Sequence, residues 1–203
     1  MPEPKYSAYD YETIDPDLKK LRNIPGWLSL DEAMWLYEQA RTRPRILEIG
    51  SWKGRSTYCL AQGCPGFVVA VDHFKGSVGE DAFWYGNARK GDFDSVRRSF
   101  LSNVGEHINN GRVLLIELDV EIFYSLTVNV FQHMRFDMIF IDGAHDEVSF
   151  AHDLRNCQQL LAPGGLLCGH DAFHKGVRPV LAEKLRNFTV APRTSIWISP
   201  PEK

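Results

Sequence analysis

The feature that most constrains the fold of this chain is the stretch 46–57, ILEIGSWKGRST, which has the pattern of a strand, a turn and the start of a helix. Its first residues form a short apolar run between a proline and a glycine, which is typical of a parallel strand covered on both faces. Gly50 and Gly54 remove side chains where the chain turns and where a ligand could approach the backbone. We expect Ser56 or Thr57 to cap the helix that follows.

An acid, Glu48, stands inside this apolar run. A carboxylate at the carboxyl end of a buried strand is costly unless it has a partner, and a ligand amine or hydroxyl would supply one. A strand–turn–helix unit with a purely structural acid explains Glu48 equally well. Taken alone, the stretch therefore leaves a structural and a ligand-binding interpretation open.

The size and charge of the chain restrict the possible functions. Its 203 residues suffice for one buried α/β core and are few for two. With 23 basic and 26 acidic residues the net charge is −3, so no overall positive field favours nucleic acid or an anionic membrane. We expect one domain with no nucleic-acid or membrane partner.

The cysteines and the apolar runs indicate a cytoplasmic protein. The four cysteines show no C-x-x-C spacing and lie in apolar surroundings, which predicts reduced core thiols: Cys59, Cys64, Cys157 and Cys168. The N-terminal residues lack an apolar signal segment, and no later run approaches the ~18 residues of a membrane helix.

After an N-terminal arm at 1–28, the segment 29–203 alternates between strand and helix patterns and is expected to form a single domain. The strands are predicted at 45–50, 67–72, 112–117, 136–142 and 165–170. The helices are predicted at 54–62, 92–104, 120–132, 146–161 and 176–187, with a further one that follows the Ser29 and Glu32 capping box. This alternation predicts a doubly wound α/β sheet.

The C-terminal tail and one long connection depart from this alternation. The runs 188–190 and 194–198 lie so close together that they must pair as a hairpin, which places one antiparallel strand in the sheet. The connection 73–91 is long for a loop and carries Phe83, Trp84 and Tyr85. It could be a lid over a ligand, or its aromatic side chains could pack it onto the domain.

A second acid follows the next predicted strand. Asp72 stands 24 residues after Glu48, where a carboxylate can accept both hydroxyls of a ribose. The G-x-G-x-x-G of dinucleotide folds would need glycines where Trp52 and Arg55 stand, so a nucleoside without a diphosphate fits better. Asp119, after the third strand, could lie near an adenine or could cap a helix.

Polar residues also follow the fourth and fifth predicted strands. Asp142 emerges after the fourth strand, with His145 three residues later, and His170 and Asp171 follow the fifth. If these strands are neighbours, Asp142, His170 and Asp171 converge on a plausible site for a divalent cation. Alternatively, Asp142 caps a helix and His170 forms a hydrogen bond in a loop.

Together these segments resemble the class I S-adenosylmethionine-dependent methyltransferases of methyltransferase family 24, near the macrocin-type sugar O-methyltransferases and the cephalosporin-hydroxylase-like proteins. The resemblance covers roughly residues 45–200. It rests on LEIGSxxGxS, VDH, FIDGxH and PGGxxxGHD. It implies a Rossmann-like, doubly wound and mostly parallel seven-stranded sheet with an antiparallel last strand and helices on both faces.

By matching position, the resemblance also implies roles for individual residues. Residues around S-adenosyl-L-methionine would be Glu48, Gly50, Ser51, Gly54, Asp72, His73, Asp119 and Asp142. Asp142, His170 and Asp171 would fall on metal ligands, and His145 on the general base. The expected partner is a small molecule that bears a hydroxyl group, and the aromatic arm suggests a homodimer.

The chain departs from the family pattern at two positions. Trp52 replaces a glycine that many members carry, which predicts a different route for the cofactor loop. His170 replaces an acid of metal-dependent relatives, and an imidazole is a poor magnesium ligand. The metal could therefore be magnesium, manganese or iron, or it could be absent.

Two other functions stay open on the sequence alone. A cephalosporin-hydroxylase-like oxygenase could use Fe(II) on the same sheet, with His170 and two aspartates as its ligand triad. A non-catalytic module could keep the nucleoside pocket without turnover.

Overall fold

A seven-stranded sheet forms the centre of the computed structural model, which describes residues 8–76, 93–129 and 134–200. The strands are β1 (Arg45–Ile49), β2 (Phe67–Val71), β3 (Val113–Ile116), β4 (Phe136–Ile141), β5 (Leu161–Gly169), β6 (Thr189–Val190) and β7 (Trp197–Ile198). The sheet has the order β3-β2-β1-β4-β5-β7-β6. β1 to β5 pair in parallel, while β7 is antiparallel to both β5 and β6. The predicted mostly parallel sheet with an antiparallel last strand is confirmed.

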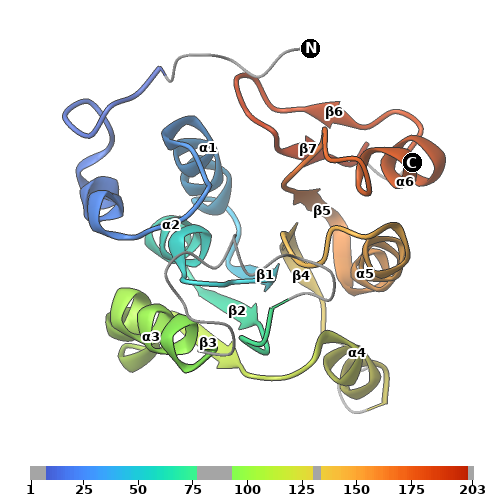
Figure 1. Cartoon of the computed structure of the whole chain (residues 1–203), viewed down its shortest axis with the longest axis horizontal. Coiled ribbons are helices and arrows are strands. Elements are labelled where there is room, and N and C mark those ends of the chain that lie inside the picture. The colour runs from blue at the N-terminus through green and yellow to red at the C-terminus, as the bar shows by residue number, and fades with distance from the viewer. Residues whose placement is uncertain (1–7, 77–92, 130–133, 201–203) are drawn as a thin grey trace.

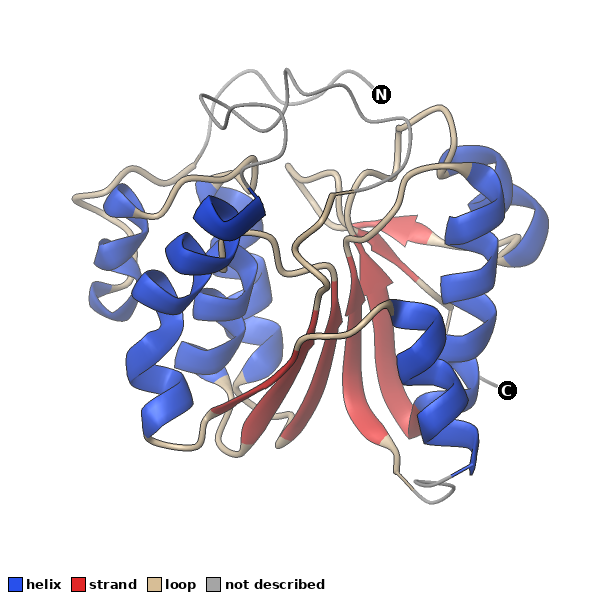
Figure 2. Cartoon of the chain, turned by 60° about the horizontal axis from the view of Figure 1, so that its bottom comes forward, coloured by secondary structure: helices blue, strands red, loops and turns tan. Residues whose placement is uncertain are grey.

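Helices cover both faces of the sheet (Figures 1 and 2). The helices α1 (Leu30–Ala40), α2 (Arg55–Gly63) and α3 (Phe93–Asn109) lie on one face, and α4 (Val120–Asn129), α5 (Glu147–Leu160) and α6 (Arg178–Lys184) lie on the other. The three layers are those of a doubly wound α/β domain.

The two faces of the sheet build two separate apolar cores. In β1, Ile46 packs into the core beneath α1, α2 and α3, whereas Leu47 packs into the core beneath α4, α5 and α6. Successive side chains of a strand point to opposite faces, so a strand covered on both sides needs an uninterrupted apolar run. For this reason the apolar run around Glu48 predicts the limits of β1 to within one residue.

The N-terminal segment packs against the first core. A 3-10 helix, η1 (Pro16–Asn23), was not expected from the sequence. Ile14, Leu18, Leu21 and Ile24 are all buried in the core that α1 and α2 share. Residues 8–28, the described part of the predicted arm, thus pack on the domain, and we call them the N-terminal layer. The division at residue 28 stays a prediction.

Several predictions fall on residues that the structure does not describe. Of the connection 73–91, only residues 73–76 are described, so the lid with its three aromatic residues lies outside the described residues. The end of the predicted helix 120–132 lies outside them too. Within the described parts of the chain, no helix is both long and apolar enough to span a membrane. All four cysteines are free and buried, as predicted.

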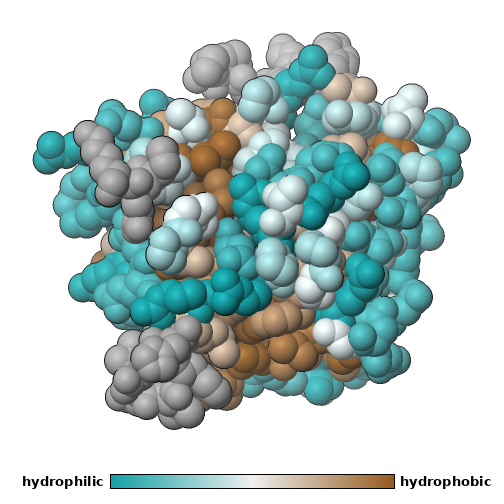
Figure 3. Space-filling view, turned by 180° about the vertical axis from the view of Figure 1, so that it is seen from behind, coloured by the Kyte–Doolittle hydropathy of each residue, from teal (hydrophilic) through white to brown (hydrophobic). Residues whose placement is uncertain are grey.

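Some large apolar side chains stay on the surface near the β3 edge of the sheet. Leu114 of β3 is 47% exposed, and Ile122 of α4 is 52% exposed. Figure 3 shows hydrophobic surface gathered at the lower edge of the back of the molecule. The homodimer that the sequence suggested stays a prediction.

Candidate functional site

The candidate site lies where the strand order reverses, between β1 and β4. Open α/β sheets bind ligands in the crevice beyond the carboxyl ends of their strands at such a switch point. Asp142 follows β4 directly, and its N–H donates to the carbonyl of Ile49 at the end of β1. His170 follows β5, and its N–H donates to the carbonyl of Ile141. The polar residues that follow β4 and β5 thereby lie together at the carboxyl end of the sheet, beside the end of β1.

Glu48 lies in the middle of the sheet, next to Ala70 of β2 and Phe140 of β4, and is fully buried. Its Oε2 accepts hydrogen bonds from the hydroxyls of Ser51 and Thr57. Burial raises the pKa of Glu48 to about 7, and these hydrogen bonds only partly oppose the effect. Thr57 therefore serves Glu48 and not the helix end, because Gly54 is the N-cap of α2 and no side chain caps it. The expected cap by Ser56 or Thr57 is wrong.

Asp72 holds the glycine turn in place. Its Oδ2 accepts from the backbone N–H groups of Ser51 and Trp52, each at 2.8 Å, and its Oδ1 accepts from that of Phe74. Asp72, which the sequence associated with the turn after β1, is thus in direct contact with that turn. Oδ2 uses both of its lone pairs on the N–H groups of Ser51 and Trp52, whereas Oδ1 still has one lone pair for a further donor.

Trp52 adopts a φ of 43°, in the left-handed region that favours glycine. Its ring stacks on that of Trp27 with the centroids 4.4 Å apart, and the ammonium of Lys53 lies 4.3 Å from its ring centroid. The left-handed backbone at Trp52 is thus accompanied by packing of its side chain against Trp27 and Lys53.

Two other predicted cofactor residues lie beside the crevice in local turns. Nδ1 of His73 accepts from the N–H of Lys75. Asp119 accepts from the N–H of Glu121 at the start of α4, the capping arrangement that the sequence left open. Neither contact brings the residue into the cluster described next.

Asp142, His170 and Asp171 converge as the sequence predicted. One ligand atom from each lies within 4.8 Å of the others. Nδ1 of His170 is 3.1 Å from Asp171 Oδ2 and 3.6 Å from Asp142 Oδ1. Asp171 adopts a φ of 58°, which its short polar side chain tolerates, and this turns its carboxylate toward His170. Asp146, not Asp142, caps α5, by accepting from the N–H of Ser149.

His145 joins this cluster from the start of the α5 segment. Its Nε2 lies 2.9 Å from Asp171 Oδ2 and 3.9 Å from Asp142 Oδ1. Burial alone would raise the pKa of Asp171, but its contacts with His145 and His170 lower it well below its ordinary value. Its carboxylate is therefore held as an anion between two imidazoles.

Glu32 is a member of the cluster that the sequence did not reveal. Its Oε1 lies 3.3 Å from His170 Nε2 and accepts from both the N–H and the hydroxyl of Ser195. Burial opposes ionisation, but the contacts with His170, together with the backbone N–H groups of Ser195 and Ser29, outweigh it and lower the pKa of Glu32 to about 2. The capping box already explained Glu32 in the sequence, and Ser195 lies 163 residues away, so no local signal joined them.

The donor set of the cluster fits a divalent cation. Burial lowers the pKa of His170, but the negative charges of Asp142, Asp171 and Glu32 outweigh it and raise the pKa well above its ordinary value. Two carboxylates and one imidazole favour manganese, iron or another borderline ion over magnesium.

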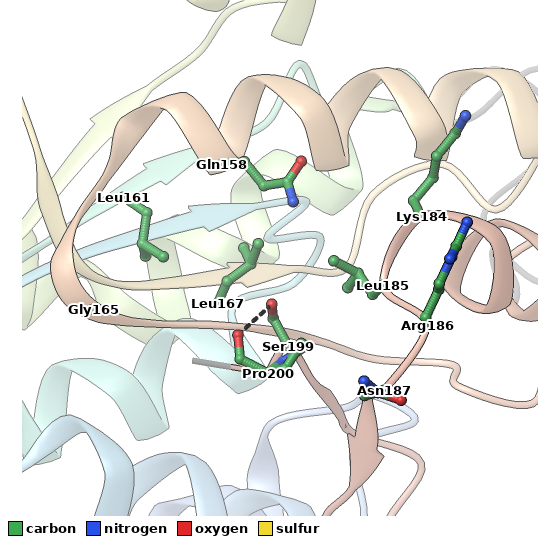
Figure 4. Close-up of a pocket in the computed structure, with 10 residues that line it drawn as sticks. All are labelled: Gln158, Leu161, Gly165, Leu167, Lys184, Leu185, Arg186, Asn187, Ser199 and Pro200. Atoms are coloured by element: carbon green, nitrogen blue, oxygen red, sulfur yellow. Dashed lines mark hydrogen bonds between the residues drawn. The ribbon is translucent and has the colours of Figure 1, made fainter. Parts of the chain in front are cut away.

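A cavity of about 370 Å³ lies at the other end of the sheet (Figure 4). Leu161 at the beginning of β5 and Pro200 after β7 line it, together with Lys184 and Arg186 near the end of α6. None of the predicted site residues lines this cavity, because they lie toward or beyond the carboxyl ends of the parallel strands.

Comparison with known proteins identifies the kind of domain. A family model described as a methyltransferase domain matches residues 47–172, which is more than half of the chain. No curated protein matches.

Solved structures share the fold at low sequence identity. TomG, an O-methyltransferase of Streptomyces achromogenes in complex with S-adenosylmethionine, has a TM-score of 0.61 and 20% identity over 93% of this chain and 91% of its own. An O-methyltransferase of Bacillus cereus with S-adenosylhomocysteine has 0.60 and 20% over 92% and 91%. The methyltransferase PaMTH1 of Podospora anserina, bound to S-adenosylhomocysteine, has 0.63 and 17% over 95% and 84%.

Proposed function

The chain belongs to the methyltransferase domain family, and on this premise we propose that it methylates a hydroxyl group of a small molecule with S-adenosylmethionine as the donor. A divalent metal ion and a histidine base assist. The observation that carries the proposal is the cluster of Asp142, His145, His170 and Asp171 beside the glycine turn after β1. The structural neighbours named above are themselves bound to S-adenosylmethionine or its demethylated product, which supports the choice of donor.

The cofactor would lie over the turn after β1. Gly50, Ser51 and Gly54 present backbone there, and Asp72 stands at the end of the neighbouring strand, where a ribose hydroxyl can donate to the remaining lone pair of its Oδ1. Glu48, beneath the turn, would interact with the methionine part. His73 and Asp119, in the turns after β2 and β3, would border the nucleoside.

Asp142, His170 and Asp171 would hold the metal ion. When bound, such an ion supplies positive charge that lowers the pKa of a nearby hydroxyl. His145 takes up the proton of the acceptor hydroxyl, and Asp171, 2.9 Å from its Nε2, stabilises the imidazolium that forms. The sulfonium methyl group needs little further activation, so positioning of the two reactants supplies much of the rate.

Binding of the cofactor is tested by calorimetry with S-adenosylmethionine and with NAD, each with and without Mn²⁺. We expect S-adenosylmethionine to bind and NAD not to bind. Binding of NAD with no binding of S-adenosylmethionine would overturn the proposal.

The chemistry is tested with a panel of sugar, phenol and polyketide hydroxyls, by measuring formation of S-adenosylhomocysteine. His145→Ala should lower turnover about 10²–10⁴-fold, the usual contribution of a general base, and leave cofactor affinity unchanged. His174→Ala is the matched control, because this ring lies 5.1 Å from that of His145 and belongs to the same surface. Equal effects of the two substitutions would remove His145 from the base role.

Two other results would identify the competing functions. Turnover that requires iron and 2-oxoglutarate would indicate an oxygenase. Binding of S-adenosylmethionine without metal uptake, and without methyl transfer to any acceptor of the panel, would indicate a non-catalytic module.

A further inference from the structure

Glu32 contacts Nε2 of His170, whereas Asp142 and Asp171 lie near Nδ1 of the same ring. Glu32 belongs to the first turn of α1, and its side chain is only 7% exposed. Oε2 accepts from the N–H of Ser29, while Oε1 accepts from the N–H of Ser195 and lies 3.3 Å from His170 Nε2. One carboxylate thus joins α1, the segment before β7, and the residue that follows β5.

The hydroxyl of Ser195 completes this contact. Its oxygen lies 2.8 Å from Glu32 Oε1 and 3.0 Å from His170 Nε2. The carboxylate of Glu32 can only accept, so the single hydroxyl hydrogen of Ser195 must point to it. The Ser195 oxygen is then the acceptor toward His170, which places a hydrogen on Nε2.

The other ring nitrogen faces the candidate ligands. With Nε2 engaged by Glu32 and Ser195, Nδ1 is directed at Asp142 and Asp171. A histidine that binds a metal through one nitrogen normally donates from the other to a carboxylate or a similar acceptor, which fixes its tautomer and orientation. In His170, Nε2 donates toward Glu32 and Ser195, while Nδ1 faces the candidate metal ligands.

We infer that Glu32 and Ser195 are positioning residues that hold Nδ1 of His170 toward Asp142 and Asp171, and so set the affinity of this centre for a borderline divalent cation. The inference rests on the proposed metal site. It assigns a function to α1, because this helix supplies the carboxylate.

The alternative is that Glu32 only stabilises α1. Glu32 and Ser29 form a complete capping box, in which the Ser29 hydroxyl accepts from the N–H of Glu32. Two substitutions separate the roles. Glu32→Gln can keep the box, because glutamine also serves at this position, but it removes the carboxylate from His170. Ser29→Ala breaks the box and leaves the carboxylate beside His170.

The experiment is a titration of the protein with Co²⁺, followed by the visible absorption of the bound ion. We expect the unchanged protein to bind and Asp171→Asn to lose binding. Glu32→Gln should weaken affinity about 10–100-fold, the usual effect of removing such a partner, while Ser29→Ala should leave it within about twofold. Ser195→Ala should also weaken the affinity for Co²⁺. It provides the test of the inference if Glu32→Gln does not fold.

The outcomes distinguish the inference from its premise. Unchanged affinity in Glu32→Gln and Ser195→Ala, with binding still lost in Asp171→Asn, overturns the role of Glu32 alone. Equal weakening by Glu32→Gln and Ser29→Ala also overturns it, since helix capping would then be the cause. If the unchanged protein does not bind Co²⁺, or if Asp171→Asn binds it as well, the metal site fails and the inference fails with it.

Discussion

At the scale of single residues, Glu48 is a carboxyl group whose ionisation the fold disfavours. Its side chain is fully buried, and among the described residues no donor reaches its Oε1. Burial raises its pKa to about 7 against the hydrogen bonds of Thr57 and Ser51. The folded protein therefore retains a proton on Glu48 at a pH where the unfolded chain, with an ordinary pKa of about 4.5, has lost it.

We predict that Glu48→Gln removes part of the pH dependence of stability. Between pH 4.5 and 7 the native state binds more protons at this position than the unfolded state, so the free energy of unfolding falls as pH rises. A shift from 4.5 to about 7 corresponds to about 3 kcal/mol, lost by the time pH passes 7. Urea unfolding at pH 4.5 and pH 8 measures the loss for both proteins.

The low-pH measurement is the internal control for this comparison. At pH 4.5 Glu48 is neutral in the folded protein, so the two proteins should have similar stabilities there. Parallel curves from pH 4.5 to 8 would show that the carboxyl does not titrate in this range. A bound ligand that donates a hydrogen bond to Oε1 of Glu48 should reduce the difference in pH dependence between the two proteins.

At the scale of elements, Arg55 attaches the N-terminal layer to α2. Its buried guanidinium donates to the backbone carbonyls of Leu21, Ile24 and Leu28. The planar group offers five donors in a fixed fork, so it can bond three carbonyls of a turning chain at once. In the sequence, Arg55 is informative only as a residue that does not fit a dinucleotide turn.

We predict that Arg55→Lys loosens residues 16–28 while the sheet stays formed. A single ammonium cannot span the three carbonyls, and each bond from a charged donor contributes about 1.5–3 kcal/mol. Hydrogen exchange should therefore accelerate in 16–28 more than in β1 and β4. Arg45→Lys is the matched control, since Arg45 pairs with Asp137 at the surface, where solvent screens the ion pair and its loss should matter little. Equal acceleration in both variants would contradict the role of Arg55.

The elements themselves were largely predictable, for a definite physical reason. Strands buried on both faces need unbroken apolar runs, so β1, β2 and β4 end within one residue of their predicted limits. η1 was missed, although Ile14, Leu18, Leu21 and Ile24 recur at helical spacing. The polar residues between them hid this pattern.

The candidate site was predictable only in part. Asp142, His170 and Asp171 follow strands, and strand adjacency brings them together. Glu32 arrives from a helix through a contact with Ser195 that depends on the tertiary packing of α1. Sequence patterns are local, so they find residues placed by a strand end and miss those placed by tertiary packing.

At the scale of the whole molecule, the two halves of the sheet meet at Gly50. A Cβ atom there would overlap the carbonyl oxygen of Asp142 and lie 2.8 Å from the Cα of Gly143. The turn after β1, which would carry the cofactor, and the turn after β4, which carries a candidate metal ligand, are thus in backbone contact. Any side chain at Gly50 must separate them.

We predict that Gly50→Ala weakens binding of both S-adenosylmethionine and Co²⁺, whereas Gly54→Ala weakens only the former. Both glycines have a φ of 83°, so alanine costs about 1–2 kcal/mol of backbone strain at either position. At Gly54 the added Cβ meets only the side chains of Val104 and Phe100 on α3. At Gly50 it displaces backbone of the other half, at a further cost of about 1–3 kcal/mol.

Calorimetry with each ligand, together with urea unfolding, tests this difference. The matched backbone strain makes Gly54→Ala the control, so loss of Co²⁺ binding in Gly50→Ala alone would demonstrate that the two turns move together. If Gly50→Ala kept its affinity for Co²⁺ while it lost S-adenosylmethionine, the halves would act independently. The cofactor turn and the metal-ligand turn would then be two sites that share a sheet, because contact at Gly50 would not transmit displacement to Asp142.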